Sequence, residues 1–326
     1  ELSVQDSHMM VHYNVRQKES YLDVDINSAL SETQKKQVHQ LLEEFQDIFT
    51  DVPKITNLGE HEIKLLNAEP VQRKPYPVPA HLVKKLDEEI DEMLKLNIIS
   101  ESTSYFCSPV VMVRKSDGSQ RVCIDFRALN ANCQLDPEQS YSADDIFNKL
   151  GGSKVYSKFD LSKGYWQVRL KEESKEYTSF STHKGKFKFE VLPFGLSSAP
   201  MTFNRIMRKL LANSQGLHNY LDDVLAHNDS WTNHLATLRD FFTRMRNANL
   251  ALKPSKCQIG YKNIEFLGQT IIEDALTPNV KHLNKIFEAA RPETKTQVKA
   301  FLGLTGFYQA YVSHYSVITA PLTDLL

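Results

Sequence analysis

Residues 218–227, HNYLDDVLAH, place two adjacent acids between short apolar runs. Asp222 and Asp223 stand in the middle of this segment, and a third acid, Asp160, ends the apolar run at 154–161. Burying a carboxylate costs free energy unless it is paired or coordinates a metal ion. The pattern therefore predicts two neighbouring strands, one of them part of a hairpin, that bring three carboxylates together.

Side-chain alternation ranks the three acids. Successive residues of a strand face opposite sides, so Tyr220 and Asp222 share one face of the sheet. Asp223 joins them only if the chain turns at this point. We therefore rank Asp160 and Asp222 above Asp223 as direct ligands.

Converging carboxylates either share protons or bind hard cations. Mg²⁺ prefers oxygen ligands and is commonly held by one or two carboxylates together with substrate phosphates. Two such ions, roughly 4 Å apart, clamp the attacking and leaving oxygens of a phosphoryl transfer. The alternative from the residues alone is that Asp222 and Asp223 form a solvated hairpin tip and that Asp160 is a helix cap or ion-pair member.

The order of the expected elements is typical of an α+β chain. Residues 1–30 are weakly patterned and are interpreted as a tail or linker, and residues 70–79 contain four prolines and must be extended. The periodicity predicts helices and strands that do not alternate as regular βαβ units. The expected helices are 32–50, 81–97, 199–212, 231–249 and several after Pro278; the expected strands include 154–161, 165–170, 177–181, 186–191 and 263–272.

Charge, hydropathy and cysteine content argue against several classes of protein. The net charge of −1 argues against a uniformly basic nucleic-acid binder but allows a basic groove beside acidic faces. No apolar run approaches the roughly 18 residues of a membrane span, so no membrane partner is expected. Four scattered cysteines give neither a zinc motif nor a disulfide framework. The chain begins with Glu1, which suggests a fragment or processed piece.

Several motifs, in order along the chain, resemble those of reverse transcriptases. YLDD at 220–223 is similar to the family's Y-x-D-D box, and FDLSKGYWQVRL at 159–170 to its first catalytic strand. LPFGLSSAPMTF (192–203), RVCIDFRALN (121–130) and EFLGQTI (265–271) resemble the nucleotide-site segment, the fingers strand and the primer grip. The segment 301–326 resembles the thumb end of gypsy-type LTR-retrotransposon polymerases. The resemblance covers about residues 60–326.

Three features depart from the family pattern. Gln120 stands where the family often has Trp, and His218 and Asn219 stand where apolar residues are usual. Residues 134–147 lack the usual proline-rich pattern leading into the palm. The protease signature D-[ST]-G is absent, and the chain stops where an RNase H domain would begin, so neither activity is expected of this chain alone.

The resemblance implies a right-hand polymerase of fingers, palm and helical thumb, with an antiparallel palm sheet. It implies an N-terminal linker and helix (1–55), a region that is mainly fingers (56–155, including the helix 81–97), a palm (156–270) and a thumb (271–326). The implied reaction joins deoxynucleotides from dNTPs to a primer 3′-hydroxyl on an RNA or DNA template, with two Mg²⁺ ions, for which Mn²⁺ could substitute.

The resemblance also implies roles residue by residue. One set of residues would bind metal ions and transfer a proton, and another would contact the dNTP and the primer-template. The implied metal ligands are Asp160, Asp222, Asp223 and the backbone of Leu161, and Lys256 would donate a proton to pyrophosphate. The implied dNTP contacts are Lys115, Arg121, Tyr165, Phe194 and Gly195, with Tyr165 excluding a ribose 2′-hydroxyl; the implied primer-template contacts are Tyr220, Phe266, Leu267 and Gly268.

The remaining expectations concern partners, location and alternatives. The expected partners are a template-primer duplex and dNTPs; a second copy of the chain, or the RNase H and integrase portions of the same polyprotein, stay open. The location implied is intracellular and cytoplasmic, including virus-like particles, with the nucleus as an alternative. Two other functions compete. One is a decayed or host-retained domain that binds nucleic acid without synthesis, and the other is a two-metal nuclease.

Overall fold

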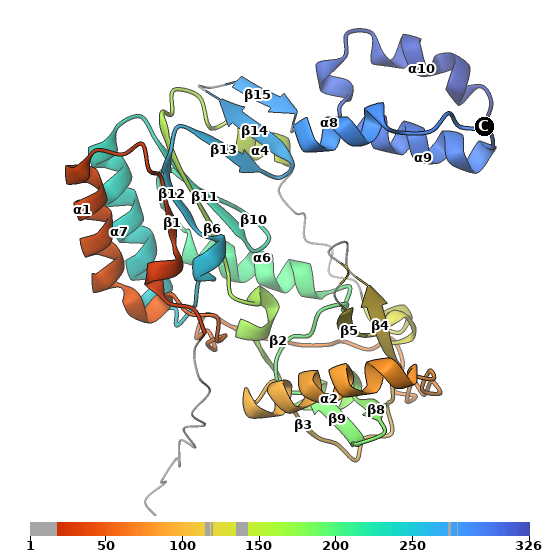
Figure 1. The fold of residues 1–326 in the computed structure, drawn as a ribbon. Coiled ribbons are helices and arrows are strands. Elements are labelled where there is room, and N and C mark those ends of the chain that lie inside the picture. Colours follow the sequence, from red (N-terminus) through yellow and green to blue (C-terminus); the bar gives the residue numbers. More distant parts are fainter. Residues whose placement is uncertain (1–17, 115–117, 119, 135–142, 273–274, 279) are drawn as a thin grey trace, which may run out of the picture.

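The computed structural model describes residues 18–114, 118, 120–134, 143–272, 275–278 and 280–326. Figure 1 shows three regions: a large sheet flanked by helices, a group of short strands beside α2, and a set of C-terminal helices extending to one side. No helix in the described part of the chain combines the length and the apolar character needed to cross a membrane.

The first region is built on a five-stranded sheet, in the order β1-β12-β6-β11-β10. β11 pairs antiparallel with both β6 and β10, so β10 and β11 form the hairpin predicted at 218–227. The strands are β1 (Asp25–Ile26), β6 (Val155–Asp160), β10 (Leu217–Tyr220), β11 (Asp223–Asn228) and β12 (Gln258–Tyr261).

Alternate residues of the two central strands divide the core into two clusters. Phe159 and Val224 join the main core, whereas Tyr156 and Leu225 belong to a second cluster that includes Phe266. The two faces of the sheet are therefore covered by different elements. The helices of this region that contribute to the main core are α1 (Glu32–Glu44), α6 (Ala199–Leu210) and α7 (Trp231–Asn247).

The N-terminal segment packs on this region. β1 pairs parallel with β12 and starts at Asp25, within the segment interpreted as a tail or linker. The rings of Phe45 and Phe49 lie 5.7 and 5.2 Å from that of Phe242 on α7. The short helical turn η1 (Tyr21–Asp23) precedes β1, and a second, η2 (Gln46–Ile48), lies between Phe45 and Phe49.

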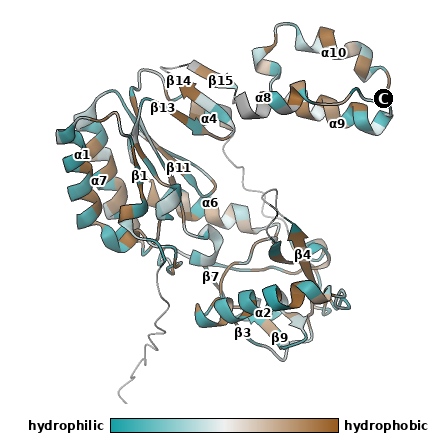
Figure 2. Cartoon of the chain, viewed as in Figure 1, coloured by the Kyte–Doolittle hydropathy of each residue, from teal (hydrophilic) through white to brown (hydrophobic). Residues whose placement is uncertain are grey.

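The second region places α2 (Ala80–Lys95) against a small sheet with the order β3-β9-β8 and near the hairpin β4-β5. Leu86, Ile90 and Met93 are buried on one side of α2, and Figure 2 shows α2 as a mixed teal and brown ribbon, as expected of an amphipathic helix. The strands are β2 (Glu60–His61), β3 (Ile99–Glu101), β4 (Val110–Arg114), β5 (Gln120–Ile124), β7 (Arg169–Leu170), β8 (Phe180–Thr182) and β9 (Gly185–Phe189); the other helices are α3 (Arg127–Ala131) and α5 (Glu172–Lys175). The helix α4 (Ala143–Phe147) lies outside this region: it contacts β10, and its Phe147 joins the second core cluster with Phe266.

The C-terminal region begins with a three-stranded sheet, β13-β14-β15, followed by helices. The single strand predicted over 263–272 is wrong, because Leu267 and Gly268 form a tight turn between two antiparallel strands. The elements are β13 (Asn263–Phe266), β14 (Gln269–Ile272), β15 (Ala275–Pro278), α8 (Val280–Phe287), α9 (Lys295–Gly306), η6 (Gln309–Tyr311) and α10 (Tyr315–Thr323).

A second wrong prediction is the strand over 165–170. Residues Gly164–Gln167 form a 3-10 helix, η3, and only Arg169–Leu170 are strand. The buried amide of Gln167 explains the difference, since it donates to the carbonyls of Ser162 and Ala251 and accepts from the Ala251 amide. The hydrogen bond joins residues 84 positions apart in the sequence, and such a distant contact produces no periodic pattern in the local sequence. Similarly, η4 (Glu176–Thr178) replaces the first part of the strand predicted over 177–181.

Candidate active site

The two predicted strands place the three acids together. Asp160 and Asp223 are register partners in the antiparallel pair β6-β11, so their side chains leave the same face of the sheet. Asp222 lies in the turn just before β11, and its carbonyl accepts a hydrogen bond from the Leu161 amide at 3.2 Å. The chain does turn at this point, and Asp223 lies directly opposite Asp160.

The turn between β10 and β11 depends on local backbone geometry. Leu221 has a φ of 53°, in the left-handed region that is unusual for a residue other than glycine. Asn219, which departs from the family pattern, donates to the Leu221 carbonyl at 3.3 Å. A polar residue before the acids therefore contributes to the geometry of the turn.

Two lysines pair with the carboxylates. Lys256, on the 3-10 helix η5 (Pro254–Lys256), donates to Asp160 Oδ2 at 2.9 Å. Lys158, two residues before Asp160 and on the same face of β6, lies 3.6 Å from Asp223 Oδ1. The sequence analysis missed Lys158, although the period of two along β6 could have identified it.

Burial and mutual repulsion shape the protonation of the site. Burial, together with the Asp160 charge, raises the pKa of Asp222 above its usual value. Burial also raises the pKa of Asp223, although Lys158 opposes the shift. Burial tends to lower the pKa of Lys256, but the hydrogen bond to Asp160 and the acidic neighbours raise it overall. The site therefore favours added positive charge.

The donor set fits a divalent hard cation. Carboxylate oxygens are the ligands that Mg²⁺ prefers, and Mg²⁺ completes its shell with water and phosphate rather than requiring an all-protein cage. The described residues contain no group of three or more His, Cys, Asp or Glu placed to hold a metal ion, so the metal site stays a prediction. The Leu161 carbonyl as a ligand stays a prediction.

A row of side chains links the acids to the β4-β5 hairpin. Burial, and secondarily the charge of Asp222, raises the pKa of Tyr165 to about 12. The Tyr165 ring lies 5.2 Å from that of Phe194, and the Arg121 guanidinium lies 4.9 Å from the centre of the Phe194 ring. The structure thus brings together four predicted residues from separate segments of the chain. Lys115 lies outside the described residues.

Tyr165 and Asp222 also share a small neighbour that the sequence analysis missed. Gly164 is buried, and a Cβ added to it would lie 3.2 Å from the Cβ of Asp222 and 3.2 Å from Phe203. Only glycine leaves this space open without displacing a neighbour.

Three of the four predicted primer contacts lie at the start of the C-terminal region, and the fourth, Tyr220, ends β10. Phe266 is fully buried in the second core cluster, where it packs near Phe147 and in the same cluster as Tyr220. Its side chain is therefore not available for direct contact with a ligand. Leu267 and Gly268 form the adjacent turn, with φ values of 49° and 77°.

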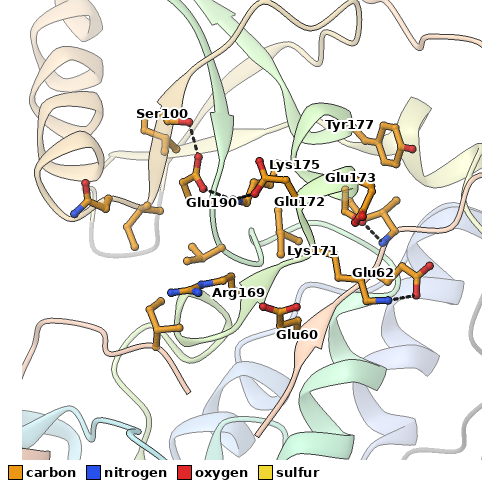
Figure 3. Close-up of a pocket in the computed structure, with 18 of the residues that line it drawn as sticks. Glu60, Glu62, Ser100, Arg169, Lys171, Glu172, Glu173, Lys175, Tyr177 and Glu190 are labelled. Atoms are coloured by element: carbon orange, nitrogen blue, oxygen red, sulfur yellow. Dashed lines mark hydrogen bonds and ion pairs between the residues drawn. The ribbon is translucent and has the colours of Figure 1, made fainter. Parts of the chain in front are cut away.

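Figure 3 shows a cavity of about 1180 Å³ lined by β7, α5 and the segment 96–100. Its charges are largely paired with one another: Lys171 contacts Glu62 at 2.9 Å, and Lys175 contacts Glu190 at 2.7 Å. None of the three acids of the hairpin site lines it. We therefore interpret this cavity as a structural feature of the second region that is separate from the candidate active site.

Comparison with known proteins agrees with this geometry. Residues 113–271 match the family described as Reverse transcriptase (RNA-dependent DNA polymerase). Over 278 residues the chain is 34% identical to the Retrovirus-related Pol polyprotein from transposon 297 of Drosophila melanogaster, which covers 83% of this chain. This chain belongs to the reverse transcriptase family. The predicted retrotransposon family is confirmed.

The reverse transcriptase chain has further transposon relatives. It is 30% identical over 300 residues to the Retrovirus-related Pol polyprotein from transposon opus of Drosophila melanogaster, and 26% identical over 311 residues to the Transposon Tf2-3 polyprotein of Schizosaccharomyces pombe. These alignments cover 88% and 92% of this chain. The chain spans about a quarter of the length of these relatives, between 23% and 30%.

Solved structures of foamy viral protease-reverse transcriptase have the same fold. The dRH form in complex with double-stranded DNA gives a TM-score of 0.86 at 25% identity, covering 91% of this chain and 53% of the other. The complex with an RNA/DNA hybrid gives 0.83 at 25% identity, covering 91% and 41%. The predicted α+β polymerase fold is confirmed.

Proposed function

We propose that this reverse transcriptase chain synthesises DNA on an RNA or DNA template, adding deoxynucleotides from dNTPs to a primer 3′-hydroxyl. The observation that carries the proposal is the register of Asp160 opposite Asp223, with Asp222 in the adjoining turn. The contact row from Tyr165 to Arg121 supports a nucleotide beside these acids, and solved relatives bound to double-stranded DNA and an RNA/DNA hybrid support a duplex partner.

In this proposal, each side chain of the site has a separate role. Arg121 offers a planar guanidinium to the triphosphate, and Phe194 supports it. Tyr165 and Phe194 lie under the sugar and leave no space for a 2′-hydroxyl. Asp160, Asp222 and Asp223 would hold two Mg²⁺ ions, which lower the pKa of the primer hydroxyl and offset charge on the leaving oxygens.

The primer oxygen would form its bond to the α-phosphorus as the bond to pyrophosphate breaks, and the hydroxyl proton would pass to water. Lys256 remains protonated beside Asp160 and is the proposed proton donor to pyrophosphate. Leu267 and Gly268, at the tip of β13-β14, would hold the primer end. The other parts of the proposal are fingers at 56–155, palm at 156–270 and thumb at 271–326, preceded by 1–55, and an intracellular site of action as part of a retrotransposon polyprotein.

Primer extension on poly(rA)/oligo(dT) with Mg²⁺ tests the proposal. We expect Asp160→Asn and Asp222→Asn each to lose about a thousandfold or more in rate, since each removes several kcal/mol of charge stabilisation in the transition state. EDTA should stop wild-type extension, and added Mg²⁺ or Mn²⁺ should restore it.

Asp229→Asn is the matched control. Asp229 lies six residues beyond Asp223, is solvent-exposed and accepts a hydrogen bond from Asn233, so its removal should leave extension unchanged. Duplex binding without extension in the wild type would favour the decayed, binding-only alternative. Hydrolysis of the duplex without nucleotide addition would favour a nuclease. Substantial extension by Asp222→Asn would refute the assigned role of the carboxylates.

A further inference from the structure

Asn130 joins the fingers to the nucleotide-side turn through both ends of its side-chain amide. Its Nδ2 donates to the Gly195 carbonyl at 2.9 Å, and its Oδ1 accepts from the Ser197 amide at 2.9 Å. The two partners lie 65 and 67 residues further along the chain. Asn130 thus holds the 194–197 turn at two points, one a donor contact and the other an acceptor contact.

The turn that Asn130 holds carries the predicted nucleotide contacts. Gly195 has a φ of 97°, and a Cβ added there would lie 3.5 Å from the Ile124 carbonyl and from Phe126. The turn is therefore seated against the end of β5. Phe194, the residue before it, packs at a tilt against the Tyr165 ring and lies under the Arg121 guanidinium.

We propose that Asn130 is a positioning residue for the incoming nucleotide. Its amide fixes the 194–197 turn, and the turn in turn fixes the position of the Phe194 ring between Arg121 and Tyr165. The inference rests on the proposed function, because it assigns the turn to dNTP binding. Asn130 itself touches neither the metal-binding carboxylates nor the substrate in this proposal.

Asparagine is required here because one side chain must both donate and accept. Aspartate is nearly isosteric with asparagine, yet the Asn130→Asp variant keeps only the acceptor for Ser197 and replaces the donor with an oxygen facing the Gly195 carbonyl. The turn would lose one contact and gain a repulsion. The substitution neither changes the shape of the side chain appreciably nor creates a large cavity.

The chain supplies a matched control two residues away. Asn132 makes the same pair of contacts with the backbone of Asn67: its Nδ2 donates to the Asn67 carbonyl at 3.0 Å, and its Oδ1 accepts from the Asn67 amide at 3.1 Å. Asn132 is the more buried of the two, with 8% of its surface exposed, but its partner lies away from the nucleotide turn. Asn132→Asp therefore removes an equivalent contact without touching Phe194.

Steady-state primer extension separates the two roles. We expect Asn130→Asp to raise the dNTP KM about tenfold, as for loss of one hydrogen bond with an unpaired partner, while kcat changes less than about twofold. Asn132→Asp should lower thermal stability at least as much and leave the dNTP KM unchanged. An unchanged KM in Asn130→Asp, or an equal rise in both variants, would overturn the inference.

A second readout does not depend on activity. The Trp166 ring lies 6.1 Å from that of Phe194, and the chain has two tryptophans, so Trp166 emission reports the turn in a Trp231→Phe background. We expect Asn130→Asp to shift this emission and Asn132→Asp to leave it unchanged; the absence of a shift in Asn130→Asp would overturn the inference. If the wild type fails to extend primers, the proposed function fails, and this measurement still decides whether Asn130 holds the turn.

Discussion

At the scale of single residues, the acids of the site depend on a residue that has no side chain. Gly164 follows β6 and leaves room for both Asp222 and Phe203. The turn that carries Asp222 and the helix that carries Phe203 come from different parts of the chain, so both would have to yield to any added atom. A misplacement of about 1 Å can cost roughly 100-fold in rate, so a displaced Asp222 should slow the proposed reaction.

We expect Gly164→Ala to lower kcat about tenfold with little change in duplex affinity, because the added methyl displaces Asp222 rather than the nucleic-acid surface. Single-turnover extension with saturating dNTP measures this. Gly151→Ala is the control: a Cβ at Gly151 meets no atom within 4 Å, and its rate should match the wild type. Equal rates for Gly164→Ala and the wild type would show that the site tolerates the methyl group.

At the scale of elements, the hairpins β10-β11 and β13-β14 have the same unusual backbone conformation at their tips. Leu221 and Leu267 both adopt positive φ, at 53° and 49°. A leucine in this conformation costs roughly 1–2 kcal/mol relative to an ordinary backbone, and asparagine or glycine is the usual choice in a two-residue hairpin turn. Strain of this kind is retained when the side chain has another role. For Leu267 we infer that this role is contact with the primer end.

The Leu267→Asn substitution distinguishes stability from function. With Gly268 after it, asparagine gives the favoured sequence for this turn and relieves roughly 1–2 kcal/mol of backbone strain. Leu267 is partly buried against the second core cluster, so loss of this packing offsets part of the gain, and we expect the free energy of unfolding to change by less than about 1 kcal/mol. The dissociation constant for the primer-template should nevertheless increase several-fold, because the apolar tip is lost. Urea unfolding and fluorescence-anisotropy titration measure the two quantities. Tighter or unchanged duplex binding would contradict the assigned role of Leu267.

The elements also show what sequence reasoning could reach. The pairing of β6 with β11 followed from apolar runs that end in acids, and α2, α6 and α7 followed from helical spacing. The strand prediction at 165–170 failed because Gln167 is anchored by residues near 251, and no local pattern encodes that contact. Gly164 and Asn130 were missed for the same reason. Their roles depend on atoms that only the folded chain brings close.

At the scale of the whole molecule, neutral histidines lie within the sheet region that carries the acids. His227 on β11 stacks on His218 of β10 at 5.0 Å and hydrogen-bonds to Ser153, and His234 of α7 hydrogen-bonds to Ser157 of β6. Burial, and next the charge on His218, lowers the pKa of His227 from 6.5 to about 4. Burial, and next His227, lowers the pKa of His234 to about 3. Folding therefore holds both imidazoles uncharged at neutral pH.

This arrangement predicts a loss of stability in mild acid. As the pH falls through 6.5, the unfolded chain takes up a proton on each imidazole, whereas the folded chain does not until about pH 4 for His227. The unfolded state thus binds more protons in this window, and the free energy of unfolding should fall by about 2 kcal/mol per histidine between pH 8 and pH 5. Urea unfolding at the two pH values measures the loss.

Comparing variants isolates the contribution of His227. The raised pKa values of Asp222 and Asp223 act in the opposite direction, since the folded state then binds protons first. That effect is common to the wild type and His227→Gln, so it cancels in their difference. We expect His227→Gln to lose about 2 kcal/mol less than the wild type between pH 8 and pH 5, and a substitution of the exposed His81 to leave the loss unchanged. Equal losses in the wild type and His227→Gln would mean that the His227 imidazole accepts its proton as readily in the folded sheet as in the unfolded chain.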